Sequence, residues 1–266
     1  MSVHSYTWAS ASVRRRRPGT AASALPWVLA AATILLEIAY PLVHGDARDR
    51  LTVVTVVVFF LASASHALVW RGAPWTLGFV VLSVGVGLTV EAVGSSTGYP
   101  FGTYDYGHAL GATVLGVPWV IPLAWAMMSY PALVAARRLT RRWWLTPIVG
   151  GVALASWDLF LDPQEVAAHH WAYAYPTPSP PLLHGIPWTN FGGWLAVSIL
   201  LMALLDRLPR RPADDRQPAT LYLWTYASSV VANAFFFHRP HVALAGGVVM
   251  GLVAVPYAWA LWSERG

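Results

Sequence analysis

The chain has 266 residues, of which 56% are hydrophobic and 11% are charged, and its formal net charge is +5. Soluble domains carry about 25% charged residues, so this composition excludes an ordinary soluble protein and indicates an integral membrane protein. The absence of cysteine excludes disulfides and thiolate metal sites.

Apolar stretches long enough to cross ~30 Å of hydrocarbon recur along the chain. They predict an all-α, polytopic membrane helix bundle of eight spans, with seven as the alternative. A basic segment, residues 1–24, precedes a single transmembrane domain over residues 25–262. The spans are predicted near residues 25–43, 51–70, 74–94, 112–136, 145–162, 187–206, 219–238 and 241–262.

The basic segment raises one alternative, a secretory or twin-arginine signal around Arg14 to Arg17. The apolar run that follows contains Glu37 and no small-x-small cleavage site, which favours a retained first helix.

The arginines predict the orientation of the bundle. All 17 basic residues are arginine, and only Arg48, Arg50 and Arg239 fall outside if the N-terminus is cytoplasmic. This positive-inside bias predicts two cytoplasmic termini and explains the net charge without nucleic-acid binding. We therefore expect a multi-pass protein of the cell membrane, with long outer loops at residues 95–111 and 163–186.

Acidic residues gather at the predicted outer end of the fifth span. Asp158 and Asp162 are four residues apart and Glu165 is three further on, which places the carboxyl groups on one helix face. Pro163 favours a helix end or kink at Asp162, so Glu165 is expected in the turn that follows. Acids within a span persist mainly when they face a bundle interior or a cavity; pairing with an arginine is the alternative.

Other polar residues are predicted at the same side of the membrane. Glu91 lies in an otherwise apolar span, and Asn190 opens the sixth span. In the first outer loop Tyr104, Asp105 and Tyr106 form a second polar group, for which a structured turn with interfacial tyrosines is the alternative. The histidines lack metal-site spacing, so a metal site is not expected.

Tryptophans are plentiful, and several lie close in sequence to these acids, although many are expected to be interfacial belt residues. A carboxylic acid kept neutral by burial can protonate an alkene. Aromatic faces stabilise the resulting tertiary cation by ~2 kcal/mol or more when desolvated, and water then captures it. The combination predicts hydration chemistry in a lipid-embedded cavity.

Two alternatives remain open. Asp158 and Asp162 resemble half of the aspartate-rich motif with which membrane prenyltransferases bind a magnesium diphosphate. A second such motif is absent from the sequence, and the predicted outer half is poor in arginine. A proton-coupled transport protein could use the same buried acids as a proton relay.

Three segments resemble the CruF-type carotenoid hydratases, the bisanhydrobacterioruberin hydratase and γ-carotene 1′-hydroxylase group. They are Gly98–Tyr106, Trp157–Pro163 and Gly185–Trp194, which lie within residues 91–194. The resemblance implies a membrane hydro-lyase that adds water to the terminal C1–C2 double bond of an acyclic carotenoid without a cofactor. It leaves open an association with other enzymes of carotenoid biosynthesis, and a carotenoid-binding or transport protein is the non-enzyme alternative.

Within this chemistry the residues themselves predict the roles. Asp158 or Asp162 is expected to protonate C2, and a water polarised by Glu91, Asp105 or Glu165 is expected to attack C1. The residues predicted to contact the substrate or orient these groups are Tyr104, Tyr106, Trp119, Trp157, Trp188 and Asn190.

Overall fold

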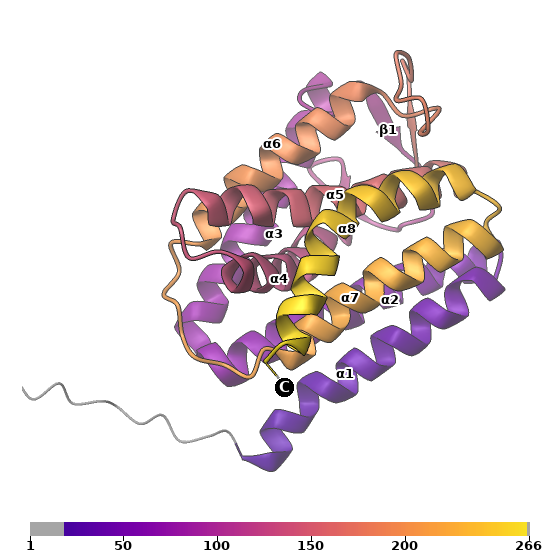
Figure 1. Cartoon of the computed structure of the whole chain (residues 1–266). Coiled ribbons are helices and arrows are strands. Elements are labelled where there is room, and N and C mark those ends of the chain that lie inside the picture. Colours follow the sequence, from indigo (N-terminus) through magenta and orange to yellow (C-terminus); the bar gives the residue numbers. More distant parts are fainter. Residues whose placement is uncertain (1–18, 265–266) are drawn as a thin grey trace, which may run out of the picture.

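Eight long helices account for most of residues 19–264, the part of the chain that the computed structural model describes. They are α1 (Thr20–Ala39), α2 (Asp46–His66), α3 (Ala73–Thr97), α4 (Ile121–Leu139), α5 (Leu145–Ala167), α6 (Trp188–Leu205), α7 (Arg216–Val231) and α8 (Pro240–Trp262) (Figure 1). Short helical segments extend three of them: η1 (Tyr40–Leu42) follows α1, η2 (Ala67–Arg71) follows α2, and η3 (Ala232–Phe236) follows α7. The predicted eight-helix bundle is confirmed. Residues 1–18 of the predicted basic segment, including Arg14 to Arg17, lie outside the described residues.

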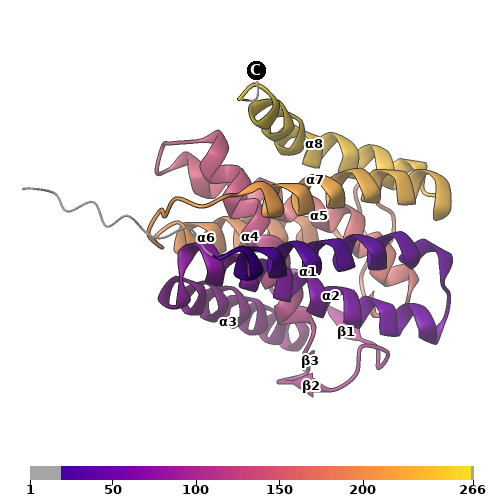
Figure 2. The same ribbon diagram turned by 90° about the horizontal axis from the view of Figure 1, so that it is seen from below.

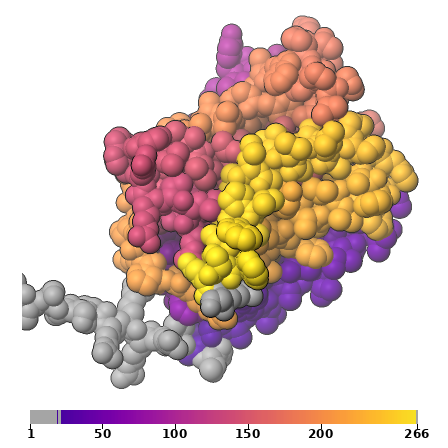
Figure 3. Space-filling model, viewed as in Figure 1, coloured from indigo at the N-terminus to yellow at the C-terminus, as the bar shows by residue number. Residues whose placement is uncertain are grey.

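Six helices of the described part are long and apolar enough to cross a membrane: α1, α2, α3, α5, α6 and α8. Their outward faces are apolar as well. On α8 the exposed large side chains Leu244, Val248, Leu252, Val255 and Trp259 recur every three or four residues, which makes one stripe along the helix. This helix covers the front of the space-filling view (Figure 3). Such a stripe is suited to contact with lipid tails.

Helix α4 is the centre of the bundle. Every residue from Trp125 to Ala136 is buried, and α4 packs against α2, α3, α5 and α7. A helix that is enclosed on all sides by other helices does not need the long apolar surface of a lipid-facing span.

The predicted start of this span at residue 112 was wrong. Residues 113–118 form a hairpin of two short strands, β2 (Thr113–Val114) and β3 (Val117–Pro118), and α4 begins only at Ile121. Leu115 and Gly116 both have positive φ angles, which suits the tight turn of a two-residue hairpin and breaks a helix.

The two long loops, predicted as separate segments, are joined by a two-stranded ribbon. Strand β1 (Tyr104–Tyr106) pairs antiparallel with β4 (Trp171–Tyr173), so that Tyr104 lies opposite Tyr173 and Tyr106 lies opposite Trp171. Side chains alternate along a strand, which places these four aromatic rings on one face and Asp105 on the other. The ribbon contacts α3 and α5. In Figure 2, β1 and the β2–β3 hairpin lie at the lower edge of the molecule.

Small residues on α3 allow aromatic side chains to approach its backbone. Its buried positions include Gly87, Glu91 and Gly94, spaced by four and three residues on one helix face. A Cβ atom at Gly87 would lie 3.0 Å from Trp125, and one at Gly94 would lie 2.9 Å from the Tyr104 hydroxyl. The two glycines therefore make room for the aromatic residues that reach Glu91.

Candidate active site

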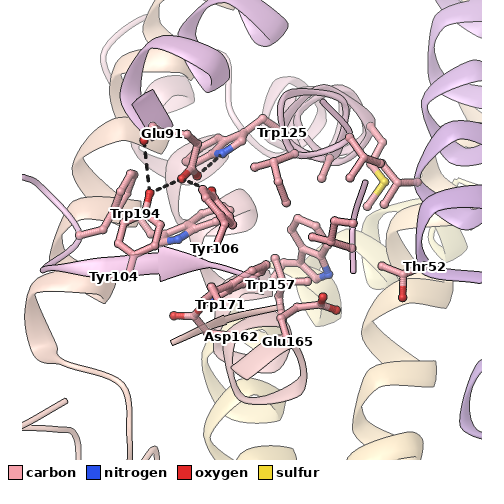
Figure 4. Close-up of a pocket in the computed structure, with 18 of the residues that line it drawn as sticks. Thr52, Glu91, Tyr104, Tyr106, Trp125, Trp157, Asp162, Glu165, Trp171 and Trp194 are labelled. Carbon is pink, nitrogen blue, oxygen red and sulfur yellow. Dashed lines mark hydrogen bonds between the residues drawn. The ribbon is translucent and has the colours of Figure 1, made fainter. Parts of the chain in front are cut away.

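A cavity of about 160 Å³, the aromatic cavity, lies where α1, α3 and α5 end and where α2, α4 and α6 begin. Its acidic lining residues are Glu37, Glu91, Asp162 and Glu165, and aromatic side chains form much of the remaining wall (Figure 4). A protein cavity of ~150 Å³ holds a molecule the size of benzene. The space therefore suits one small apolar group rather than a whole long-chain lipid.

Glu91 is held at the edge of this cavity by three donors. The hydroxyl groups of Tyr104 and Tyr106 donate to Oε2 at 2.5 and 2.7 Å, and the indole Nε1 of Trp125 donates to Oε1 at 2.9 Å (Figure 4). An indole N–H can only donate, and three donors on one carboxyl group stabilise its ionised form. Burial of Glu91 opposes that form, so what the three contacts fix is the position of its carboxyl group.

The ribbon tyrosines are suited to donate these hydrogen bonds. Burial and then the charge of Glu91 raise the pKa of Tyr104 and of Tyr106 well above that of a free phenol. Burial, followed by the charges of Asp162 and Asp158, raises the pKa of Tyr173 in the same way. All three phenols stay protonated at neutral pH.

Asp162 and Asp158 form a buried pair that shares one amide. Asp162 accepts hydrogen bonds from Trp171 Nε1 at 2.8 Å, from the Tyr173 hydroxyl at 2.9 Å and from Asn190 Nδ2. The same Asn190 nitrogen donates to Asp158 Oδ2 at 2.8 Å, whereas Asp158 Oδ1 is buried with no hydrogen-bond partner. Two carboxyl groups this close and this buried cannot both ionise. The arrangement favours one proton on the pair, with Asp158 Oδ1 as its best site.

The prediction that α5 ends or kinks at Asp162 was wrong about the helix end. The helix runs through Pro163 to Ala167, so Glu165 lies within the helix and not in the following turn. Tertiary contacts outweigh the local preference against a helix before proline. Asp162 is held by the ribbon, and the carbonyl oxygen of Pro163 accepts a hydrogen bond from Arg239 at 2.9 Å.

Glu165 connects the cavity to a histidine that the sequence analysis did not select. His170 Nδ1 lies 2.5 Å from Glu165 Oε2, and His170 Nε2 lies 3.1 Å from Asp49 Oδ1. Burial alone would lower the pKa of His170, but the hydrogen bonds and charges of Glu165 and Asp49 outweigh it and raise the pKa. His170 thus links the end of α5 to the start of α2 through two acidic partners.

This ion pair predicts a pH-dependent stability. Because the pKa of His170 is raised in the folded state, its contribution is fully present below the ordinary pKa of about 6.5 and is lost as pH rises through the raised value. We expect the unfolding temperature of the wild type to fall over that range and the His170→Asn variant to lack this fall.

His169→Asn is the matched control, since His169 is exposed at a positive φ angle that asparagine tolerates. Thermal unfolding in detergent at stepped pH measures the effect. Parallel pH profiles for the wild type and His170→Asn would contradict the assignment.

The structure brings most of the predicted site residues together. Glu91, Tyr104, Tyr106, Trp157, Asp162, Glu165 and Asn190 line the aromatic cavity, and Asp158 contacts it through Asn190. Three predicted residues lie elsewhere. Asp105 points away on the opposite face of β1, and the side chains of Trp119 and Trp188 are 40% and 55% exposed.

Six further aromatic residues line the cavity but were not among the predicted site residues: Tyr40, Phe101, Trp125, Trp171, Tyr173 and Trp194. Trp125 stacks on Trp194 with 4.0 Å between ring centroids, and Trp157 meets Trp194 edge-on at 6.3 Å. Residues 171–173 repeat the aromatic-x-aromatic spacing of residues 104–106, which was the available signal for the pairing of the two loops.

A second cavity of about 150 Å³, the polar cavity, lies between α1, α5 and α7. It shares Glu37, Trp157 and Glu165 with the aromatic cavity. Glu37 Oε2, Thr225 Oγ1 and Asn233 Oδ1 are buried there without a hydrogen-bond partner. Buried polar atoms of this kind are generally satisfied by ordered water, and the polar cavity has room for several molecules.

The sequence is similar to known proteins of carotenoid biosynthesis. A sequence model for the family described as "Carotenoid biosynthesis protein" matches residues 51–261. The bisanhydrobacterioruberin hydratase of Haloarcula japonica is 30% identical over 187 residues, which cover 66% of this chain and 59% of that protein. The match therefore spans less than two thirds of the relative's length. No solved structure matches the chain.

Proposed function

The chain belongs to the carotenoid biosynthesis protein family, and from that premise we propose that it is a carotenoid hydratase. It adds water to the terminal C1–C2 double bond of an acyclic carotenoid end group. The main support is the buried Asp158–Asp162 pair beside a cavity that is walled by aromatic rings and sized for one end group. The hydratase name of the Haloarcula japonica relative gives independent support.

The Asp158–Asp162 pair supplies the proton. Between turnovers the proton resides on Asp158; it then passes to Asp162, which lines the cavity and delivers it to C2. Breaking the C1–C2 π bond in this way leaves a tertiary cation at C1. A general acid in such a position contributes ~10²–10⁴-fold to the rate.

The cavity wall stabilises the cation. The stacked indoles of Trp125 and Trp194, with Trp157 edge-on to Trp194, present π electrons to C1. In its ionised form the carboxyl group of Glu91, fixed by three donors, adds a preorganised negative charge that does not reorient as the cation forms.

The polar cavity supplies the water. Its oxygen attacks C1, and Glu165 at the shared wall accepts the proton that the water releases. Glu165 and Asp162 line the same cavity, so this proton returns from Glu165 to the acid pair through cavity water. The Glu165–His170–Asp49 chain leads from the cavity toward the surface, where Asp49 is 23% exposed, and holds Glu165 in place. The sum of the steps is one water added and no net change in protons.

Removing a polar atom from the polar cavity should slow hydration without affecting substrate binding. In Thr225→Val the shape is kept and the unpartnered hydroxyl is lost. We expect the turnover rate to fall about three- to tenfold, the scale of one net hydrogen bond to water. Thr220→Val is the control, because the Thr220 hydroxyl lies outside this cavity and bonds the Arg216 carbonyl oxygen. Equal rates in the two variants would contradict this water route.

Pigment mass spectrometry tests the function itself. Cells that make an acyclic carotenoid are grown with and without the protein, in ordinary water and in H₂¹⁸O. The proposal expects products heavier by one water molecule, with the heavy isotope retained in the hydroxyl group. Unchanged pigment with both forty-carbon and fifty-carbon acyclic substrates contradicts it, and activity that a chelator abolishes favours the magnesium-dependent alternative.

A further inference from the structure

A cluster of arginines surrounds a pocket at the opposite end of the bundle from the aromatic cavity. Thr52 near the start of α2 and Trp125 near the start of α4 line the aromatic cavity, whereas Arg71 and Arg137 near the ends of the same helical segments line this pocket. Its volume is about 210 Å³. The arginine pocket is lined by Arg71, Arg137, Arg138, Arg210 and Arg211, with Val134 and Asp215.

The positive charge of the pocket is only partly neutralised within the protein. Asp215 pairs with Arg71 at 2.5 Å, and Asp206 pairs with Arg137 at 2.8 Å and more distantly with Arg210. Glu264 pairs with Arg138 at the exposed rim. Five guanidinium groups thus face three carboxylates, which leaves an excess of positive charge.

Two of the guanidinium groups are fixed before any ligand binds. Arg71 donates to the Tyr130 hydroxyl, the Arg211 carbonyl oxygen and Asp215. Arg137, whose side chain is 10% exposed, donates through Nε and Nη2 to Asp206 and to the carbonyl oxygens of residues 205 and 208.

The remaining nitrogen of Arg137, Nη1, is buried and has no hydrogen-bond partner. A buried N–H group without a partner is costly, so it is expected to find an acceptor. Because the pocket is positively charged, an anionic acceptor is favoured.

We propose that the arginine pocket binds a phosphate group. Guanidinium groups match phosphate oxygens in geometry and charge and bind them through paired hydrogen bonds. Trp143 and Trp144, 81% and 47% exposed, follow α4 at this end of the bundle and are typical of the membrane interface, where lipid phosphates lie. Basic pockets at the ends of transmembrane helices bind anionic headgroups, so the phosphate of a membrane lipid and a free phosphate are the two sources to distinguish.

The test uses the full-length protein purified in a neutral detergent. Its thermal unfolding and native mass spectrum are measured with added phosphatidylglycerol, with phosphatidylcholine and with inorganic phosphate. We expect phosphatidylglycerol or inorganic phosphate to bind and to raise the unfolding temperature, and the responding ligand identifies the source. No binding of either, or an equal response to phosphatidylcholine, overturns the proposal.

Arginine variants test whether the phosphate binds in this pocket. Arg210→Gln and Arg211→Gln, tested separately, should each weaken binding by ~10-fold through the loss of a charge-assisted contact. If Arg211→Gln fails to fold, Arg210→Gln carries the test alone, because the Arg210 side chain is exposed at the rim. Arg207→Gln is the matched control, since Arg207 is exposed in the same loop and does not line the pocket. Unchanged affinity in Arg210→Gln, or an equal loss in Arg207→Gln, overturns the assignment.

Discussion

Replacing Asp162 by asparagine should lower the hydration rate by ~10²–10⁴-fold, the contribution of a positioned general acid. The substitution keeps the shape of the side chain and removes the group that delivers the proton to C2. Trp171, Tyr173 and Asn190 all donate to Asp162, so an amide there also loses one acceptor. Turnover is measured from the hydroxylated carotenoid that forms in membranes with a fixed amount of protein.

The neighbouring carboxyl groups provide the controls for this variant. Asp158→Asn should also lower the hydration rate. Without the Asp158 carboxyl group, Asp162 has no neighbouring acid that holds the proton between turnovers. Asp105→Asn should leave the rate unchanged, since Asp105 is exposed on the outer face of β1. Full activity in both Asp158→Asn and Asp162→Asn would remove this pair from the mechanism.

Replacing Trp194 by leucine should lower the turnover rate by about 30-fold, which corresponds to the ~2 kcal/mol of a desolvated cation–π contact. Trp194 stacks on Trp125 at 4.0 Å and contacts Trp157, so it is central to the wall that faces the cation. The loss should appear in the turnover rate more than in substrate binding, because the positive charge exists only during the reaction.

Two further variants separate charge stabilisation from packing. Trp194→Phe retains an aromatic face and should keep most of the activity that Trp194→Leu loses. Trp188→Leu removes an exposed indole, 55% accessible, and should have little effect. Thermal unfolding of each variant shows whether the protein remains folded. Equal turnover in Trp194→Leu and Trp194→Phe would contradict cation stabilisation by this ring.

The helices could be predicted because the bilayer sets their length and excludes charge. The start of α4 could not, since its position depends on a tight hairpin at Leu115 and Gly116 and on the enclosure of the helix by its neighbours. The continuation of α5 through Pro163 likewise depends on contacts with the ribbon and with Arg239, which are distant in sequence.

The acids of the site could be predicted because a carboxyl group in an apolar span is costly. Glu91, Asp158 and Asp162 were therefore expected to have a functional role. The aromatic wall could be predicted only in part from the tryptophans close to these acids, because the chain has 15 tryptophans and an interfacial indole has the same sequence signature as one in a cavity. The pairing of β1 with β4 decides which rings face inward, and the aromatic-x-aromatic spacing that the two strands share does not by itself fix the register of that pairing.

The size of the aromatic cavity determines how the proposed hydratase treats a long symmetric polyene. A space of about 160 Å³ admits one terminus and leaves the conjugated backbone outside. The enzyme then selects an end and is indifferent to total length. Both termini can be hydrated only in separate encounters, with release and reversal of the molecule between them. Such a distributive catalyst lets the half-modified pigment, with a hydroxyl at one end, accumulate before the doubly modified product appears.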